Sequence, residues 1–462
     1  MGCDALFYRL AYARVKAPYL RDRTGPIMLS NLSLDDSLVE ARENYAIARP
    51  HARQAHEAAC AHLPGGNTRT VLFHGPFPLR AARGEGPYLY DTDGHRYVNL
   101  LGEYTAGVFG HSHPVIKAAL ADAIELGLNL GAHNEAEADL AALVTARFPA
   151  MERVRFTNSG TEANLMAVAT ARAVTARDAV MVFKGGYHGG LMYFKDGVGG
   201  VNAPFSFILG TYNDIEDARA LIREAGDTLA CAILEPMLGS GGCIPADPAF
   251  LKALREETAA SGALLIFDEV MTSRFGPNGA GALAGVTPDL MTLGKWVGGG
   301  MSFGAFGGRR EIMDVFDPTR PGSLPHAGTF NNNILSMKAG IAALTQAFTA
   351  SEAEALHEKG EALRARINAI FETQGVAMHA SGMGSLMTIH GVAGPVTHMT
   401  DIDGSNDAAK ELLFLDLLAR GYYIARRGFL ALSIALEDTH LNGFAETIEE
   451  IVQTRKAALP RR

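Results

Sequence analysis

The sequence predicts an α/β fold in which a mostly parallel β-sheet is flanked by helices and followed by a smaller C-terminal domain. Between residues 114 and 310, short apolar runs alternate with helical periods, as expected for the strands and crossover helices of a parallel sheet. The chain has 462 residues, a length at which one core usually divides into two domains. A helical stretch near residues 333–350 separates the alternating runs from a second unit.

The composition is that of a globular enzyme, with 48% hydrophobic and 20% charged residues. The formal net charge is −9 and the basic residues are scattered, which argues against a nucleic acid or an anionic membrane as partner. The four cysteines include no C-x-x-C pair, so we expect reduced thiols and a cytoplasmic location. The sequence contains no apolar run of about 18 residues, so no membrane-spanning helix is predicted.

We predict four regions along the chain. Residues 1–32 are basic but lack the apolar segment of a signal peptide, so we expect an N-terminal appendage that need not be ordered, with a transit peptide as the alternative. Residues 33–110 are expected to form an N-terminal helix and a β-rich flap. Residues 111–350 would form the large ligand-binding domain, and residues 351–462 the small C-terminal domain.

The first helix is indicated by its cap and its periodicity. Ser33 and Asp36 have the spacing of a capping box, and Leu38, Ala41 and Tyr45 follow at helical spacing. Strands are expected at residues 71–73, 88–90, 97–98, 154–157, 179–184, 231–235, 264–268, 290–293, 386–389 and 430–434.

The segment from Asn158 to Asn164 predicts an anion site. An apolar run ends just before it, small hydroxyl residues and Gly160 follow, and residues 163–171 have a strongly helical sequence. Unpaired N–H groups and the positive end of the helix dipole would face the loop, which suits a phosphate. A plain capped helix is the alternative interpretation.

Asp268 and Glu269 directly follow an apolar strand, where a carboxylate would be buried. A buried carboxylate needs a cationic partner. A protonated pyridine nitrogen of a cofactor is one such partner, because an ionised Asp would keep that nitrogen protonated. Metal ligation by both carboxylates is the rival interpretation.

Lys295 ends another apolar run and is flanked by glycines. Desolvation there would lower the pKa of its ammonium group and free the amine as a nucleophile, as Schiff-base chemistry requires. A solvated turn lysine would have the same local sequence.

The order of S-G-T, G-Y-H-G, E-P, D-E-V, G-K and G-T resembles the class III (fold-type I) pyridoxal-5′-phosphate (PLP) aminotransferases, over roughly residues 60 to 460. The resemblance implies a fold-type I transferase with a seven-stranded, mostly parallel sheet in the large PLP-binding domain and a smaller α+β C-terminal domain. By this resemblance, Lys295 is the Schiff-base lysine and moves protons between the substrate and the cofactor, while Asp268 pairs with the pyridine nitrogen.

The same resemblance assigns the other cofactor contacts. Tyr187 would stack on one face of the ring, with His188 beside it and Val270 beneath the other face. Glu235 would lie near the 3-hydroxyl group. The remaining implied phosphate ligands are Ser159, Gly160 and Thr161. From the neighbouring subunit, Thr329 would reach the same phosphate, which implies a homodimer with its active sites at the interface.

Two arginines indicate a carboxylate substrate, because a guanidinium group binds a carboxylate bidentately. Arg69 lies in the predicted flap and Arg427 in the predicted small domain, and both contexts resemble the β-phenylalanine aminotransferase group. Which arginine binds which carboxylate stays open. A surface ion pair is the alternative for each, especially for Arg427 because Arg426 adjoins it.

The expected function is therefore transfer of the amino group of a β-amino acid, such as 3-amino-3-phenylpropanoate, to 2-oxoglutarate or pyruvate. A glutamate-1-semialdehyde aminomutase, an amine transaminase and a PLP-binding sensor are the alternatives. Residues 193–204 do not resemble the gating loop of the aminomutase. No metal is assigned, because His111 and His113 lack a third ligand at a suitable spacing.

Overall fold

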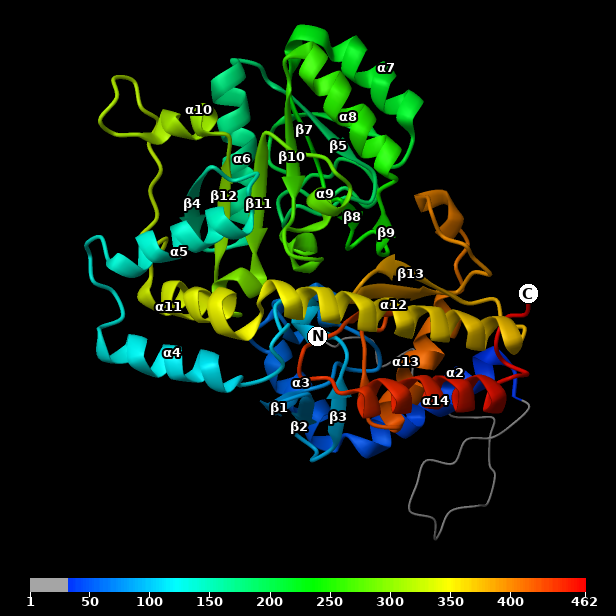
Figure 1. Cartoon of the computed structure of the whole chain (residues 1–462). Coiled ribbons are helices and arrows are strands. Elements are labelled where there is room, and N and C mark those ends of the chain that lie inside the picture. The colour runs from blue at the N-terminus through cyan, green and yellow to red at the C-terminus, as the bar shows by residue number, and fades with distance from the viewer. Residues whose placement is uncertain (1–31) are drawn as a thin grey trace.

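The computed structural model describes residues 32–462, so the predicted appendage lies almost entirely outside the described residues (Figure 1). Ser33 caps the first described helix, α2 (Leu34–Ala48), by accepting a hydrogen bond of 3.2 Å from the Asp36 N–H. Leu38, Ala41 and Tyr45 are its buried apolar residues, which confirms the helical periodicity predicted for this segment.

A seven-stranded sheet forms the centre of the larger part of the molecule (Figure 1). Its order is β4-β12-β11-β10-β7-β5-β6, and only β12 runs antiparallel to its two neighbours. The predicted mostly parallel sheet is confirmed. The strands are β4 (Arg153–Thr157), β5 (Ala179–Phe183), β6 (Ser206–Gly210), β7 (Leu229–Leu234), β10 (Leu264–Asp268), β11 (Leu290–Gly294) and β12 (Gly304–Gly308).

Both faces of this sheet are covered, which is why its central strands are mostly apolar. On β5, Val180 and Val182 pack in one apolar cluster with α6 (Gly160–Thr175). Met181 and Phe183 face the opposite side, in a cluster with α7 (Ile215–Ala225) and α8 (Pro248–Ser261). Further helices of this part are α4 (Pro114–Glu125), α5 (Glu135–Arg147), α9 (Ala280–Leu283), α10 (Arg310–Met313) and α11 (Ile334–Ala342).

The N-terminal flap and the C-terminal part of the chain share one sheet. Its order is β1-β2-β3-β15, and β15 pairs in parallel with β3 although more than 300 residues separate them. The strands are β1 (Ala81–Glu85), β2 (Tyr88–Asp91), β3 (Arg96–Asn99) and β15 (Tyr422–Tyr423). The rest of the C-terminal part comprises α12 (Ala350–Thr373), β13 (His379–Met383), β14 (Leu386–His390), α13 (Asp407–Ala419), β16 (Phe429–Ala431) and α14 (Asp438–Thr454).

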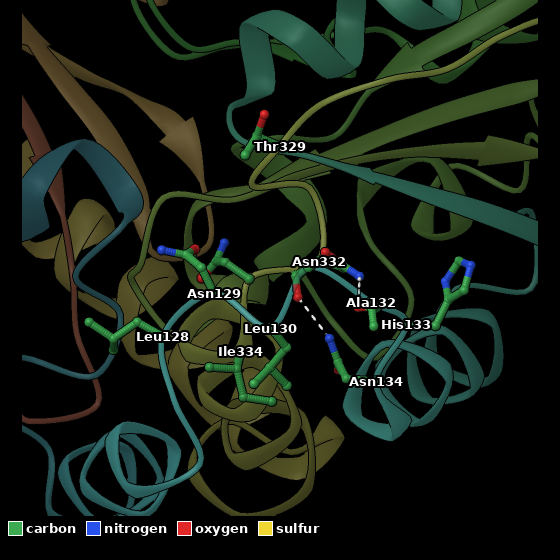
Figure 2. Close-up of a pocket in the computed structure, with 11 residues that line it drawn as sticks. Leu128, Asn129, Leu130, Ala132, His133, Asn134, Thr329, Asn332 and Ile334 are labelled. Carbon is green, nitrogen blue, oxygen red and sulfur yellow. Dashed lines mark hydrogen bonds between the residues drawn. The ribbon is translucent and has the colours of Figure 1, made fainter.

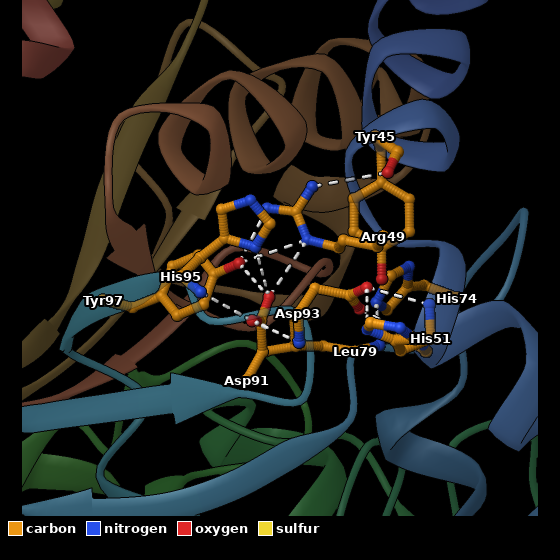
Figure 3. A network of polar contacts seen from close by, with 10 residues as sticks. Tyr45, Arg49, His51, His74, Leu79, Asp91, Asp93, His95 and Tyr97 are labelled. Carbon is orange, nitrogen blue, oxygen red and sulfur yellow. Dashed lines mark hydrogen bonds and ion pairs between the residues drawn. The ribbon is translucent and has the colours of Figure 1, made fainter.

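A buried polar network fastens the flap to the N-terminal helices (Figure 3). Arg49 donates to the Tyr97 hydroxyl at 2.7 Å, and this hydroxyl donates to Asp91 at 2.6 Å. From the turn between β2 and β3, Asp93 accepts hydrogen bonds from the N–H groups of His51 and Ala52 at the start of α3 (Pro50–Cys60). The position of the flap is therefore fixed by charged side chains that are almost completely buried, those of Arg49, Asp91 and Asp93.

Three predicted elements differ in the structure. The strand expected at residues 71–73 is wrong: Thr70–Leu72 form a 3₁₀ turn closed by a hydrogen bond from Phe73 N to Thr70 O, and Val71 is half exposed. The strand expected at residues 430–434 ends at Ala431, because the next backbone N–H groups donate to two separate segments. The helix expected at residues 333–350 is interrupted by a π-helical turn at Ala343–Ala347.

Across residues 32–462, none of the helices combines the length and the apolar character that crossing a bilayer requires.

Candidate active site

The predicted site residues gather at the carboxyl edge of the large sheet, where the loops that follow parallel strands meet. Asp268 ends β10, and Lys295 follows β11 in the first position of a short 3₁₀ turn. The other predicted ligands on this edge follow β4, β5 and β7: Ser159, Gly160, Thr161, Tyr187, His188 and Glu235.

Asp268 is a buried acceptor surrounded by donors. Its carboxylate accepts hydrogen bonds from Asn164 Nδ2 and His188 Nδ1, both at 2.8 Å, and from Val270 N at 3.0 Å. Thr292 lies directly beside it in the register of β10 and β11 and donates to Asn164 Oδ1 at 2.6 Å. These contacts fix the direction of the carboxylate and of the Asn164 amide together.

Asn164 and Thr292 were not predicted as site residues from the sequence, although signals for both were present. Asn164 lies one helical turn after Gly160 in the same motif, on the side of α6 that packs on the sheet. Thr292 is the polar residue in the apolar run that leads to Lys295. A polar residue in a strand buried on both faces needs a hydrogen-bond partner, which here is the Asn164 side chain.

Glu235 is a second buried carboxylate and holds the loop that carries Tyr187. It accepts hydrogen bonds from the backbone N–H groups of Tyr187 and Gly239, each at 3.0 Å. Burial, with a further contribution from the negative charge of Asp268, raises the pKa of Glu235 to about 7. Tyr187 is 39% exposed, and its ring contacts that of Tyr193 edge to face.

Lys295 has the left-handed backbone conformation, with φ of 55°, which is unfavourable for a residue with a Cβ. Burial lowers the pKa of its ammonium group to about 8, although Asp268 and Glu235 oppose this shift. A substantial neutral fraction of the amine therefore exists near neutral pH, as a nucleophile requires. Strain of this kind at a site rich in titratable groups is typical of functional residues.

The start of α6 leaves donors available for an anion. Ser159 caps the helix by accepting from Glu162 N at 3.2 Å, while the N–H groups of Gly160 and Thr161 have no acceptor within residues 32–462. A Cβ atom at Gly160 would lie 2.8 Å from Val270, so only glycine allows the two to pack this closely. The helix start, Val270 and the end of β10 are therefore in direct contact.

Arg69 and Arg427 both contact the ring of Tyr104, and each guanidinium carbon lies 5.7 Å from the ring centroid. Neither arginine has an ion-pair partner in the part of the chain that the structure describes. Arg426, in contrast, forms an ion pair of 2.7 Å with the buried Glu411. Of the two adjacent arginines, Arg426 is therefore the ion-paired one, and Arg427 has no carboxylate partner within residues 32–462.

Glu269 does not share a site with Asp268. Its carboxylate accepts hydrogen bonds from Thr272 Oγ1 and from the N–H groups of Ala280 and Gly281, at 2.7 to 2.9 Å. Within residues 32–462, no group of three or more His, Cys, Asp or Glu side chains could hold a metal ion. The contacts of Glu269 give it a structural role at the start of α9.

Thr329 lies on an exposed loop beside a cavity of about 560 Å³ (Figure 2). Residues 128–134 form one wall of this cavity, and Thr329 with residues 332–334 forms the other. Asn134 Nδ2 donates to Asn332 O at 3.0 Å and joins the two walls. The side chain of Thr329 has no hydrogen-bond partner within residues 32–462, so its contact with a neighbouring subunit stays a prediction.

A family model described as aminotransferase class-III matches residues 73–404. A β-phenylalanine transaminase from Variovorax paradoxus is 48% identical, with 94% of this chain and 100% of the relative covered. The solved structure of a β-phenylalanine aminotransferase from that organism superposes with a TM-score of 0.91 at 48% identity, covering 93% of this chain and 100% of that one.

Two other relatives broaden this comparison. A glutamate-1-semialdehyde 2,1-aminomutase from Desulforudis audaxviator is 37% identical, with 87% of this chain and 98% of the relative covered. A solved structure described as a transaminase with PLP bound has a TM-score of 0.80 at 32% identity and covers 90% of this chain and 99% of that one.

Proposed function

The chain belongs to the class-III aminotransferases, and we propose that it transfers the amino group of a β-amino acid, such as 3-amino-3-phenylpropanoate, to 2-oxoglutarate or pyruvate. It is a PLP-dependent enzyme of this family. When bound, PLP supplies an aldehyde that receives the amino group and a ring that stabilises negative charge on the adjacent carbon.

The residues at the carboxyl edge of the sheet fit this cofactor. The buried carboxylate of Asp268 would hold a proton on the pyridine nitrogen, and its fixed hydrogen bonds orient it for this purpose. Nε2 of the buried His188 has no partner within residues 32–462, which leaves one polar atom there for a ligand. The free N–H groups of Gly160 and Thr161, at the positive end of α6, would bind the phosphate.

The remaining contacts would define the plane and the edge of the ring. Tyr187 is partly exposed and would stack on one ring face, and Val270 contacts the helix start beneath the opposite side. Glu235, with its raised pKa, would lie at the 3-hydroxyl edge as a group able to hold or release a proton near neutral pH.

Lys295 is the residue that would join the cofactor and move protons. Its lowered pKa makes the amine available for attack on an aldehyde, and the same amine can accept a proton from the substrate carbon and deliver it elsewhere in the site. The negative charges of Asp268 and Glu235 oppose a further decrease of its pKa, so the amine can still carry a proton at neutral pH.

One observation carries the choice of substrate class: Arg69 and Arg427 face the same aromatic ring and have no ion-pair partner within residues 32–462. Each lies close enough to affect a group of the site. Burial lowers the pKa of Lys295 and Arg427 adds to this shift, whereas burial raises the pKa of Tyr187 and Arg69 opposes that shift. Two unpaired guanidinium groups favour substrates with carboxylates over simple amines.

A substrate panel tests this proposal. We expect turnover of 3-amino-3-phenylpropanoate with 2-oxoglutarate or pyruvate, and little turnover of arylalkyl amines without a carboxylate. Isomerisation of an amino aldehyde without any oxo-acid acceptor would instead identify an aminomutase, the activity named for relatives at 37% identity. Efficient turnover of simple amines would contradict the role of the arginines.

Arg69→Ala tests the binding of carboxylates directly. We expect a higher KM for at least one carboxylate substrate, with a loss of roughly 1.5–3 kcal/mol because a charged hydrogen bond disappears. Steady-state kinetics with donor and acceptor varied separately would measure this loss. Arg426→Ala serves as the control. Because Arg426 is paired with Glu411, its loss should not affect the binding of a substrate carboxylate.

We further propose a homodimer in the cytoplasm. Leu126, Leu128 and Leu130 are each about half exposed, and Phe330 is exposed beside Thr329. These apolar side chains line or adjoin the cavity at Thr329, which suits burial against a second copy of the chain. The three cysteines within the described residues are free, which is compatible with a reducing compartment.

A further inference from the structure

Tyr104 lies in a strained backbone segment that brings three parts of the chain together. Glu103, Tyr104 and Thr105 all have positive φ, at 49°, 53° and 79°. Such a run of non-glycine residues is costly and persists only where the surrounding contacts enforce it. The run is held on one side by Asn99, whose amide donates to Glu103 at 2.6 Å.

The hydroxyl of Tyr104 connects the site to the flap. It donates to the backbone carbonyl of Val71 at 3.1 Å, within the turn that begins directly after Arg69. The turn forms no strand and Val71 is half exposed, while Leu72 packs against a buried apolar cluster. The Tyr104 hydroxyl is therefore a direct restraint on the segment that carries Arg69.

The ring of Tyr104 connects the site to the C-terminal part of the chain. It stacks on Phe429 at a centroid distance of 5.5 Å and an interplanar angle of 14°. Arg427 lies against both rings, at 5.2 Å from the centroid of Phe429. Its Nη1 donates to Ser240 O at 2.7 Å, while its buried Nε has no partner in the described chain.

The guanidinium carbons of Arg69 and Arg427 are each 5.7 Å from the centroid of the Tyr104 ring, so the distance between them cannot exceed twice this value. Since neither guanidinium group has an ion-pair partner within residues 32–462, two positive charges beside one ring are available to attract anions. The electron-rich faces of the two aromatic rings are the groups that hold the guanidinium groups in place.

Building on the proposed function, we propose that Tyr104 is the specificity-determining residue that sets the positions of both carboxylate-binding arginines. Its hydroxyl restrains the segment of Arg69, and its ring supports Arg69 and Arg427 together. The hydroxyl bonds to Val71 and also interacts with the Arg427 guanidinium. Because Arg427 is anchored as well by its hydrogen bond to Ser240 O, removing only the hydroxyl affects Arg69 more than Arg427. Removing the ring affects both.

Two variants separate these contributions. Tyr104→Phe keeps the ring and removes the hydroxyl, and Tyr104→Leu removes both. Tyr88→Phe is a matched control, because the Tyr88 hydroxyl also makes one hydrogen bond, to His440, and its ring also carries an arginine, Arg96, at 4.6 Å. Arg69→Ala and Arg427→Ala identify which ligand depends on which arginine.

The measurements are the KM and kcat of donor and acceptor, and the dissociation constants of two unreactive carboxylates, 3-phenylpropanoate and glutarate, from the holoenzyme. We expect Tyr104→Phe to weaken the ligand that depends on Arg69 by about three- to tenfold, the effect of one lost hydrogen bond. The ligand that depends on Arg427 should change less, and Tyr104→Leu should weaken both. PLP affinity, melting temperature and the Tyr88→Phe enzyme should remain as in the wild type.

Three results would overturn the proposal: unchanged affinities in Tyr104→Phe, equal losses for both ligands in that variant, or an effect that follows Arg427 alone. Binding of unreactive carboxylates does not require turnover. If the expected binding pattern were found in an enzyme that does not use β-amino acids, the donor assignment would fail while the role of Tyr104 would stand.

Discussion

At the scale of single residues, the chemistry of the site depends on the burial of Lys295 among groups that already have hydrogen-bond partners. Its ammonium group is disfavoured by burial, and the two carboxylates nearby are each occupied by other donors. Asp268 is fixed by Asn164 and His188, and Glu235 by two backbone N–H groups. A lysine in this setting gains nucleophilicity without losing its ability to carry a proton.

Replacing Lys295 by alanine should abolish turnover. We expect loss of the absorption at about 420 nm that a lysine-bound cofactor gives, and no borohydride-reducible adduct at position 295. Absorption spectra and peptide mass spectrometry after reduction would measure both. Lys252→Ala, at an exposed position on α8, should retain the absorption and the adduct at position 295. An active, coloured Lys295→Ala enzyme would refute the assignment.

The pKa of Lys295 predicts the pH dependence of cofactor capture by the apoenzyme. The neutral amine should increase as pH rises through about 8, well below the 10.5 of an ordinary lysine. In the unfolded chain the amine still binds its proton between these two values, so the free energy of unfolding of the apoenzyme should increase with pH in this window.

Stopped-flow absorption of PLP capture at several pH values would measure the midpoint. In Asp268→Asn, one of the negative charges that oppose the shift is removed, so the midpoint should move to lower pH. A midpoint near 10, or a shift to higher pH in that variant, would contradict this explanation.

At the scale of elements, the proposed phosphate site depends on contact between the loop after β5 and the start of α6. Gly189 has φ of 109°, and a Cβ atom there would lie 2.2 Å from Thr161 Oγ1. Asn164 also donates to the backbone carbonyl of His188, at 3.2 Å, so the same loop is joined to α6 at two points. Glycine at this position lets the two elements approach.

Gly189→Ala should therefore weaken PLP binding by displacing Thr161. We expect a loss of at least about tenfold in affinity, equivalent to about 1.4 kcal/mol. Titration of the apoenzyme with PLP, followed by fluorescence or absorption, would measure it. Gly190→Ala is the matched control, because a Cβ atom at the adjacent glycine meets no atom within 4 Å. Equal affinities of the two variants would exclude a steric role for Gly189.

Some parts of the flap adopt a structure that depends on distant contacts, which the local sequence pattern does not reveal. Its strands at residues 88–91 and 96–99 follow from alternating apolar residues and a turn, and these were predicted. The apolar run at residues 71–73 has the composition of a strand but finds no strand partner. It instead forms a turn that Tyr104 holds through Val71, and this contact depends on a residue 33 positions away.

At the scale of the whole molecule, the proposed dimer predicts complementation between two defective subunits. If Thr329 serves the site of its neighbour, a subunit with Lys295→Ala and another with Thr329→Ala can together form one site in which both residues are intact. Coexpressed mixed dimers, purified with two different tags, should regain activity above that of either parent. Activity no higher than the mean of the parents would indicate that Thr329 serves its own subunit.

Much of the site could be predicted because its residues lie in short motifs at the ends of strands. A strand followed by a glycine-flanked lysine, or by paired carboxylates, places those side chains at one edge wherever the strands are parallel. Arg427 was harder to assign, because the sequence shows two adjacent arginines and only the position of Glu411 shows which one is paired.

The sequence by itself determined the alternation of strands and helices, the family and the order of the chemically active motifs, because these depend on periodicity and turns within a few residues. Only the tertiary structure decided which of the two adjacent arginines is ion-paired, which hydrogen-bond donors orient Asp268, and that Arg69 and Arg427 both contact Tyr104. Those relations join residues tens to hundreds of positions apart, and they arise when the flap, the large sheet and the C-terminal part pack against one another.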